Sequence, residues 1–143
     1  MRAILRSALL LLLLAGTANA MMPPEVYRKA REGAPYHVQI AITKVDAPNK
    51  EPGTCLVEGQ VLRIFKNATG ELAPDEIVSF AVACHRKGER VPIGGTVWLD
   101  TDALEHADYM EVYLAGTAAG MAVPLWNYRI IDHLSDTPQF PVE

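Results

Sequence analysis

The chain has 143 residues, of which 13 are lysine or arginine and 17 are aspartate or glutamate, so its net charge at neutral pH is −4. This acidic balance, with no run of clustered basic residues, argues against binding to nucleic acid or to an anionic membrane surface. After loss of the leader described below, about 120 residues remain, which suits one domain with a single core.

The first residues form a pattern typical of a cleavable secretory signal peptide. Arg2 and Arg6 supply positive charge, a leucine run follows at residues 9–14, and residues 18–20 (Ala-Asn-Ala) are small where a signal peptidase cuts. The apolar stretch is shorter than the roughly 20 residues that span a bilayer. We therefore expect removal of residues 1–20, a mature chain that begins at Met21, and a secreted or periplasmic product that is not inserted in a membrane.

Removal of this leader makes the protein more acidic. The leader contains two arginines and no acidic residue, so the mature chain keeps 11 basic residues against 17 acidic ones, a net charge of −6. No nucleic-acid partner is therefore expected.

A short helix is expected at the start of the mature chain. Pro23 and Pro24 suit the entry to a helix, and Gly33 suits the position just after its end. Residues 21–35 are therefore interpreted as an N-terminal helical extension.

The rest of the mature chain is dominated by the two-residue periodicity of half-buried strands. Residues 36–134 are expected to form one β domain, followed by a loose C-terminal tail at residues 135–143, which contains two prolines. No internal repeat or interdomain linker interrupts this domain. A helical turn is expected over residues 101–106, and strands over residues 36–43, 55–66, 76–84, 96–100, 109–114 and 125–131.

One expected strand contains a glycine near its centre, Gly59. Val57 and Val61 lie on one face of that strand, whereas Leu62 and Ile64 lie on the other. Such a change of face is typical of a strand that bends or carries a bulge. We therefore expect Gly59 to adopt a positive φ or to lie where another backbone approaches closely.

The two cysteines, Cys55 and Cys84, each belong to an expected strand and share a face with apolar neighbours. Disulfides persist in the compartment that the leader implies. We therefore predict a structural Cys55–Cys84 disulfide. The spacing matches neither the C-x-x-C of redox dithiols nor the clustered ligands of zinc sites, so no cofactor is expected.

Short strands separated by polar turns can bury their alternate faces in a sandwich or a small barrel. An immunoglobulin-like sandwich places its core tryptophan between two cysteines, whereas Trp98 follows Cys84 here. A glycine-bent strand suits a barrel better. The expected fold class is therefore all-β, a small five-stranded barrel of the oligonucleotide/oligosaccharide-binding (OB) type with one or two short helices.

Three segments of the β domain share a further pattern. Residues 55–66 contain V-x-G-x-V followed by F-K, residues 77–84 end at a cysteine, and residues 94–99 read Gly-Gly-Thr-Val-Trp-Leu. The pattern resembles the netrin-like barrels, a family that includes the tissue inhibitors of metalloproteinases and bacterial relatives. The resemblance implies an OB-like fold. The inhibitors block a metal with a cysteine at the mature N-terminus, whereas this mature chain begins at Met21, so the resemblance assigns that activity to no residue here.

An acidic cluster follows the expected strand around Trp98. Carboxylates and an imidazole that are close in sequence can converge on a cation, but the spacing lacks the alternating ligands and central glycine of a calcium loop. We interpret the cluster as capping and solvated residues, with metal binding as the alternative. Its members are Asp100, Asp102, Glu105, His106 and Asp108.

Tyr109 and Tyr113 form a candidate binding surface. They lie on the strand face opposite Met110, Val112 and Leu114. If those three residues build the core, the tyrosines are exposed and can serve a protein or carbohydrate partner. The alternative is that loops or the tail cover them.

No catalytic motif accompanies these features. Ser79 lies inside an expected strand, Ser135 lies in the tail, and His37, His85 and His133 are scattered, so no nucleophile and base are evident as a pair. The sequence leaves enzymatic activity open and favours a non-enzymatic binding or inhibitory module of the cell envelope. The alternative is a small metal-assisted hydrolase that uses the acidic cluster.

Overall fold

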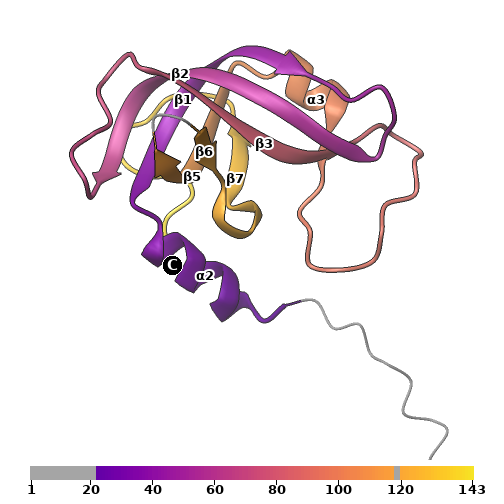
Figure 1. The fold of residues 1–143 in the computed structure, drawn as a ribbon, viewed down its shortest axis with the longest axis horizontal. Helices are drawn as coiled ribbons and strands as arrows, with labels where there is room; N and C mark the ends of the chain where they lie inside the picture. The colour runs from indigo at the N-terminus through magenta and orange to yellow at the C-terminus, as the bar shows by residue number, and fades with distance from the viewer. Residues whose placement is uncertain (1–21, 118–119) are drawn as a thin grey trace, which may run out of the picture.

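The computed structural model describes residues 22–117 and 120–143, so the expected signal peptide lies outside the described residues. The described chain is mostly β, with one seven-stranded sheet that curls into a half-barrel and two short helices beside it (Figure 1). None of the described helices has both the length and the apolar character needed to cross a bilayer. The elements are α2 (Pro24–Gly33), β1 (Tyr36–Asp46), β2 (Gly53–Asn67), β3 (Ile77–His85), β4 (Leu99–Asp100), α3 (Thr101–His106), β5 (Tyr109–Thr117), β6 (Gly120–Ala122), the single turn η2 (Pro124–Trp126) and β7 (Tyr128–Ile131).

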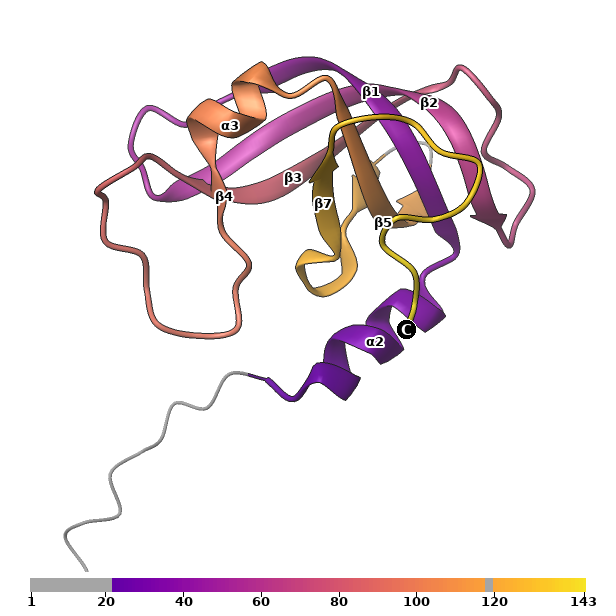
Figure 2. The same ribbon diagram turned by 180° about the vertical axis from the view of Figure 1, so that it is seen from behind.

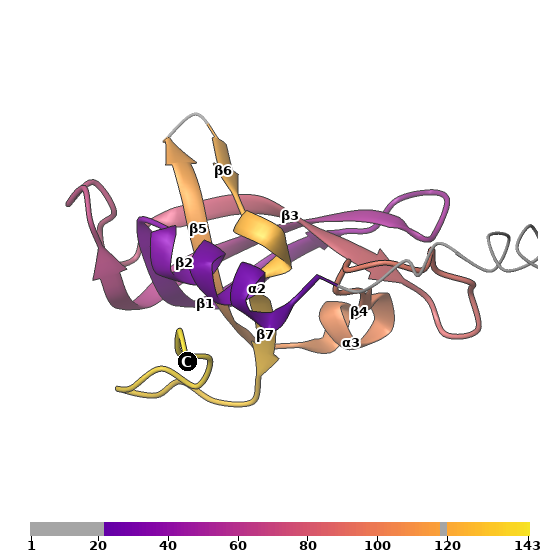
Figure 3. The same cartoon turned by 90° about the horizontal axis from the view of Figure 1, so that it is seen from below.

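Strand β1 lies at the centre of the sheet, paired antiparallel with β2 on one side and with β5 on the other. The sheet continues from β2 to β3, and the short β4 runs parallel to β3. The edge of β5 that faces away from β1 pairs with β7 over residues 109–112 and with β6 over residues 115–117. Strands β5 and β6 project from the sheet as a hairpin (Figure 3). The sheet thus has seven strands where the sequence predicted five, and β4 and β6 are only 2 and 3 residues long.

Helix α2 lies beside the half-barrel and buries none of its residues. Pro24 and Glu25 occupy its first turn, and Gly33 is its last residue, whereas the sequence predicts Gly33 just after the end. The hydroxyl of Tyr27 donates a 2.5 Å hydrogen bond to the carbonyl of Gly95, which attaches the helix to the loop between β3 and β4.

The predicted disulfide is confirmed. Cys55 and Cys84 are bonded, their Cα atoms are 5.9 Å apart, and both are fully buried. They lie on the inward faces of β2 and β3, where alternate residues enter the core. Other core residues include Val38, Ile40, Val57, Val61, Phe80, Val82, Met110, Val112 and Leu114.

Gly59 lies at a close approach between β2 and β1. A Cβ atom added there would lie 2.5 Å from Cδ1 of Ile40 and 2.9 Å from the carbonyl oxygen of Ala41. The pairing register shifts opposite it, between Ile42 and Lys44, so the bulge belongs to β1. Of the two expectations for Gly59, close approach is confirmed and a positive φ is wrong.

Strands β1 and β5 are buried on both faces over part of their length. Residues 36–40 and 110–114 are all buried, because the core covers one face and residues 135–143 cover the other (Figure 2). This C-terminal segment, expected as a loose tail, has no regular secondary structure but is hydrogen-bonded to the sheet.

Candidate functional site

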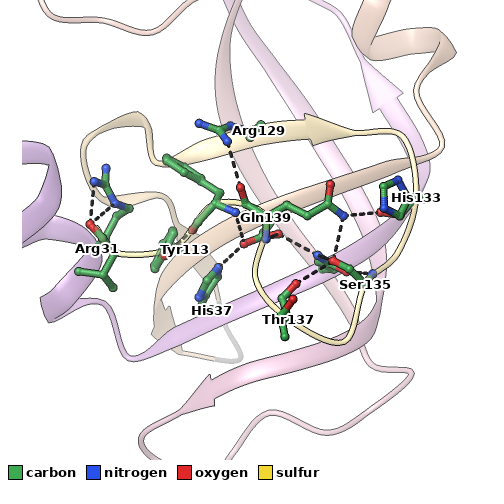
Figure 4. A network of polar contacts seen from close by, with 12 residues as sticks. Arg31, His37, Tyr113, Arg129, His133, Ser135, Thr137 and Gln139 are labelled. Atoms are coloured by element: carbon green, nitrogen blue, oxygen red, sulfur yellow. Dashed lines mark hydrogen bonds and ion pairs between the residues drawn. The ribbon is translucent and has the colours of Figure 1, made fainter.

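A buried carboxylate holds the C-terminal segment against the sheet (Figure 4). Glu111 in β5 is fully buried, with its Oε1 2.7 Å from Nε2 of His37. Its Oε2 accepts a 2.8 Å hydrogen bond from the side-chain amide of Gln39. The backbone N–H groups of Gln139 and Phe140 each donate to the same carboxylate at 2.9 Å. The position of Phe140 therefore depends on Glu111.

The charge state of Glu111 follows from these contacts. Burial alone raises the pKa of this carboxyl, but the hydrogen bonds from His37, Gln39 and the two backbone N–H groups favour the charged form. The net result is a pKa below the ordinary value of a glutamate. The side chain is therefore an ionised acceptor at neutral pH.

This network contains a serine and a histidine, but they are not arranged for nucleophilic catalysis. The Ser135 hydroxyl accepts hydrogen bonds from Gln39 and Gln139 and donates to the carbonyl of Thr137. The ring of His37 stacks on Tyr113 with centroids 3.9 Å apart. The serine hydroxyl thus has partners other than an imidazole, and the network has a positioning role.

The two candidate binding tyrosines have different environments. Tyr109 is half-buried, whereas Tyr113 is fully buried. The Tyr113 hydroxyl donates a 2.6 Å hydrogen bond to the carbonyl of Phe140, and burial raises the pKa of Tyr113 to about 12. Of the two alternatives for Tyr113, exposure and cover by loops or the tail, the second holds, because the C-terminal segment covers this face of β5.

Three side chains of the acidic cluster make local structural contacts. Asp100 caps α3, since its Oδ1 accepts a 3.0 Å hydrogen bond from the backbone N–H of Ala103, and this contact lowers the pKa of Asp100. Arg86 forms ion pairs with Asp102 at 2.5 Å and with Glu105 at 3.4 Å. These side chains fix α3 to the loop after β3.

The other two members of the cluster lie near a small cavity. His106 makes a 2.7 Å hydrogen bond through Nδ1 to the backbone carbonyl of Asp102. His106 and Asp108 line a cavity of about 260 Å³ together with Asp132. Within residues 22–117 and 120–143, no group of three or more histidine, cysteine, aspartate or glutamate side chains is placed to hold a metal ion.

A cleft of about 470 Å³ lies beside β7. Residues 126–130 form one wall, and residues 95–97 with Leu99 form the other. Helix α2 contributes Tyr27 and Arg31, and the C-terminal segment contributes Phe140. Four segments of the chain thus meet around one mostly apolar cleft.

Two arginines gather at this cleft. The guanidinium groups of Arg31 and Arg129 lie over the ring of Phe140, 5.0 and 4.4 Å from its centroid. Arg31 donates hydrogen bonds to Asn127 and to the carbonyl of Val142, and Arg129 donates to a backbone carbonyl. In the part of the chain that the structure describes, neither guanidinium forms an ion pair with a carboxylate.

The electrostatic environment of Arg31 reflects this arrangement. Burial lowers the pKa of Arg31, Tyr113 opposes that effect, and the positive charge of Arg129 lowers the pKa further. Two like charges close together raise the local positive potential of a protein that is acidic as a whole. The cleft is therefore suited to a ligand with a negative charge.

The backbone is strained at the edge of the cleft. Leu125 and Trp126 have φ values of 45° and 53°, although neither is glycine. Such a left-handed conformation costs roughly 1–2 kcal/mol per residue and occurs preferentially at functional sites. Trp126 lines the cleft, so the strained turn places an aromatic side chain at the site.

No motif or spacing in the sequence indicates this cleft. Arg31, Arg129 and Phe140 lie far apart in the chain and belong to no motif. The one available signal was Phe140, an aromatic residue between two prolines in a segment interpreted as a loose tail.

No protein-family model matches the chain, and no curated protein matches it in sequence.

Proposed function

We propose that this protein is an exported, non-enzymatic binding module of the cell envelope, and that the cleft beside β7 is its binding site. The observation that carries the proposal is a mostly apolar cleft at which two arginines lack a carboxylate partner in residues 22–117 and 120–143. Binding sites commonly combine an apolar lining with a few convergent polar groups. Because Phe140 is fixed by Glu111, part of the wall is positioned before a ligand arrives.

The proposed fold family is the OB-like, netrin-like barrel. It is supported by the central place of β1, which pairs with both β2 and β5, and by helix α3, which lies in the connection from β3 to β5. The V-x-G-x-V pattern of residues 57–61 lies in β2, where Gly59 meets β1 closely. Under this assignment β4 and β6 are short additions to a barrel of five main strands.

The proposed location is the periplasm or the extracellular space. It is supported by the sequence of residues 1–20 and by the buried Cys55–Cys84 disulfide, since disulfides persist in oxidising compartments. The cleft favours a protein partner over a neutral carbohydrate, because the paired arginines offer a charge that a neutral sugar does not use.

No second function is proposed. The hydrolase alternative uses the acidic cluster, and the contacts of Asp100, Asp102 and Glu105 with the α3 backbone and Arg86 supply no observation in its favour.

Titration with an anionic apolar fluorophore, anilinonaphthalene sulfonate, tests the binding site. We expect saturable binding to the folded domain and at least about a tenfold loss in Val97→Glu, because Val97 lines the cleft and the new carboxylate repels the sulfonate. Leu56→Glu is the matched control, since Leu56 is similarly exposed (51% against 41%) but lies on β2. Equal affinity in both variants, or no saturable binding, would contradict the proposal.

A further inference from the structure

The cleft lies along an unpaired edge of the sheet. Among the described residues, strand β7 pairs with β5 alone, and the backbone N–H of Tyr113 donates to the carbonyl of Asn127. Hydrogen-bonded residues alternate along an antiparallel pair, so Arg129 and Ile131 exchange bonds with β5. The backbone groups of Tyr128 and Ile130 therefore point the other way, toward the cleft.

The opposite wall offers a second edge that runs in a compatible direction. The pairings that connect β7 to β3 through β5, β1 and β2 are all antiparallel, and β4 is parallel to β3. Strands β7 and β4 therefore run in the same direction (Figure 2). A single added strand that runs antiparallel to β7 is therefore also antiparallel to β4. Such a strand is antiparallel to its neighbour on each of its two sides.

The two walls are connected by a side chain instead of by strand pairing. The hydroxyl of Tyr128 donates to the carbonyl of Val97 and accepts a 3.1 Å hydrogen bond from the backbone N–H of Ala83. A whole tyrosine side chain lies between β7 and Val97, so the walls are farther apart than the roughly 4.8 Å of neighbouring strands. Burial raises the pKa of Tyr128 to about 12, which keeps this bridging hydroxyl protonated.

We propose that the occupant of the cleft is an extended acidic peptide segment of a partner protein, which pairs as an added strand with the open edge of β7. Strand addition supplies main-chain hydrogen bonds for the backbone groups of Tyr128 and Ile130. This inference rests on the proposed function, since it names the partner class of the same cleft.

The side chains of β7 define the peptide sequence that fits. Tyr128 is buried and Ile130 half-buried, whereas Arg129 between them is exposed. The side chains of a strand paired with β7 alternate between the two faces of the sheet in step with those of β7. The residue opposite Arg129 is therefore acidic and within reach of the two arginines, and its two neighbours are apolar and fill the cleft. The recognised pattern is apolar, acidic, apolar.

The test uses the mature protein and the capped peptide Thr-Val-Glu-Val-Thr, with binding measured by calorimetry or NMR titration. We expect saturable binding, about a tenfold loss when the peptide glutamate is lysine, and a similar loss when its amides that face β7 are N-methylated. Arg129→Glu should reverse the preference so that the lysine peptide binds better. Arg90→Glu, the same change at an exposed arginine outside the cleft lining, should leave the preference as it was.

The outcomes separate this inference from the proposed function. If the fluorophore binds in the cleft but the peptide does not bind, or the N-methylated peptide binds equally well, strand addition is overturned and the binding site stands. An unreversed preference in Arg129→Glu overturns the acidic pattern. If neither ligand binds, both proposals fail. Circular dichroism of each variant shows that the loss is not due to unfolding.

Discussion

The carboxylate of Glu111 lies 2.7 Å from the imidazole of His37, and both side chains are buried between the sheet and the C-terminal segment. The same carboxylate binds the backbone of Gln139 and Phe140. The ring of Phe140 in turn lies beneath Arg31 and Arg129 at the cleft. The buried carboxylate of Glu111 therefore positions the part of the cleft wall that Phe140 forms.

Glu111→Gln is expected to destabilise the fold by about 2 kcal/mol, because an amide cannot accept at both atoms and its N–H₂ group faces donors. The free energy of unfolding is measured from urea denaturation at neutral pH. Glu58→Gln, at an exposed position of β2, should change it by less than about 0.5 kcal/mol. Equal stability of the Glu111→Gln variant and the wild type would show that the network contributes nothing.

The same residue predicts acid sensitivity. The pKa of Glu111 is lower in the folded state than its ordinary value of about 4.3, so its stabilisation is complete above that pH and is lost as the pH falls through the lower folded value. Urea midpoints at a series of pH values below about 5 should fall more steeply in the wild type than in Glu111→Gln. Parallel curves would contradict this assignment.

Gly59→Val is expected to lower the free energy of unfolding by about 1 to 3 kcal/mol, because the added atoms collide with Ile40 and the backbone of Ala41. Gly94→Val is the control, since no atom lies within 4 Å of a Cβ built there. The urea midpoints of both variants are compared with the disulfide intact. A midpoint of Gly59→Val equal to that of the wild type would mean that β1 and β2 are not in close contact at this position.

The sequence allowed prediction of features that depend on the direction of side chains along one strand. Cys55 and Cys84 share inward faces with apolar neighbours, so their bond was predictable, and Gly59 indicated a close approach between strands. The sequence did not show that β5 is covered on both faces. Exposure of Tyr113 and its cover by the tail consequently both stayed open, because strand periodicity gives no information about a distant segment that covers the polar face.

The candidate site was missed for a related physical reason. Arg31 and Arg129 look like ordinary solvated arginines in sequence, and their proximity depends on the packing of α2 and of Phe140 against η2 and β7. Glu111 also looks like a solvated residue of an alternating strand. Its pairing with His37 becomes visible only when the register of β1 and β5 is known.

Replacing both cysteines, Cys55→Ala with Cys84→Ala, is expected to lower the free energy of unfolding by about 2 to 5 kcal/mol. The loss arises in large part from greater freedom of the unfolded chain. Urea denaturation measures it, and non-reducing peptide mapping of the exported wild type should recover the two cysteines in one linked peptide pair. Free thiols in that material would contradict a structural disulfide.

The exported protein is expected to begin at Met21, because residues 18–20 present small side chains at the cleavage site. Intact-mass spectrometry of protein recovered from the periplasm or the culture medium measures this directly. Retention of the leader in the exported material would exclude the proposed processing.

Amide chemical-shift mapping with the peptide Thr-Val-Glu-Val-Thr locates the binding surface and so tests whether it is the cleft beside β7. We expect the largest shifts at Tyr128, Ile130 and Val97, whose backbone groups border the cleft. Binding in the cleft would be contradicted if the cleft amides were unchanged and the largest shifts lay at the cavity near Asp132 or at the one lined by Ser79 and Met121.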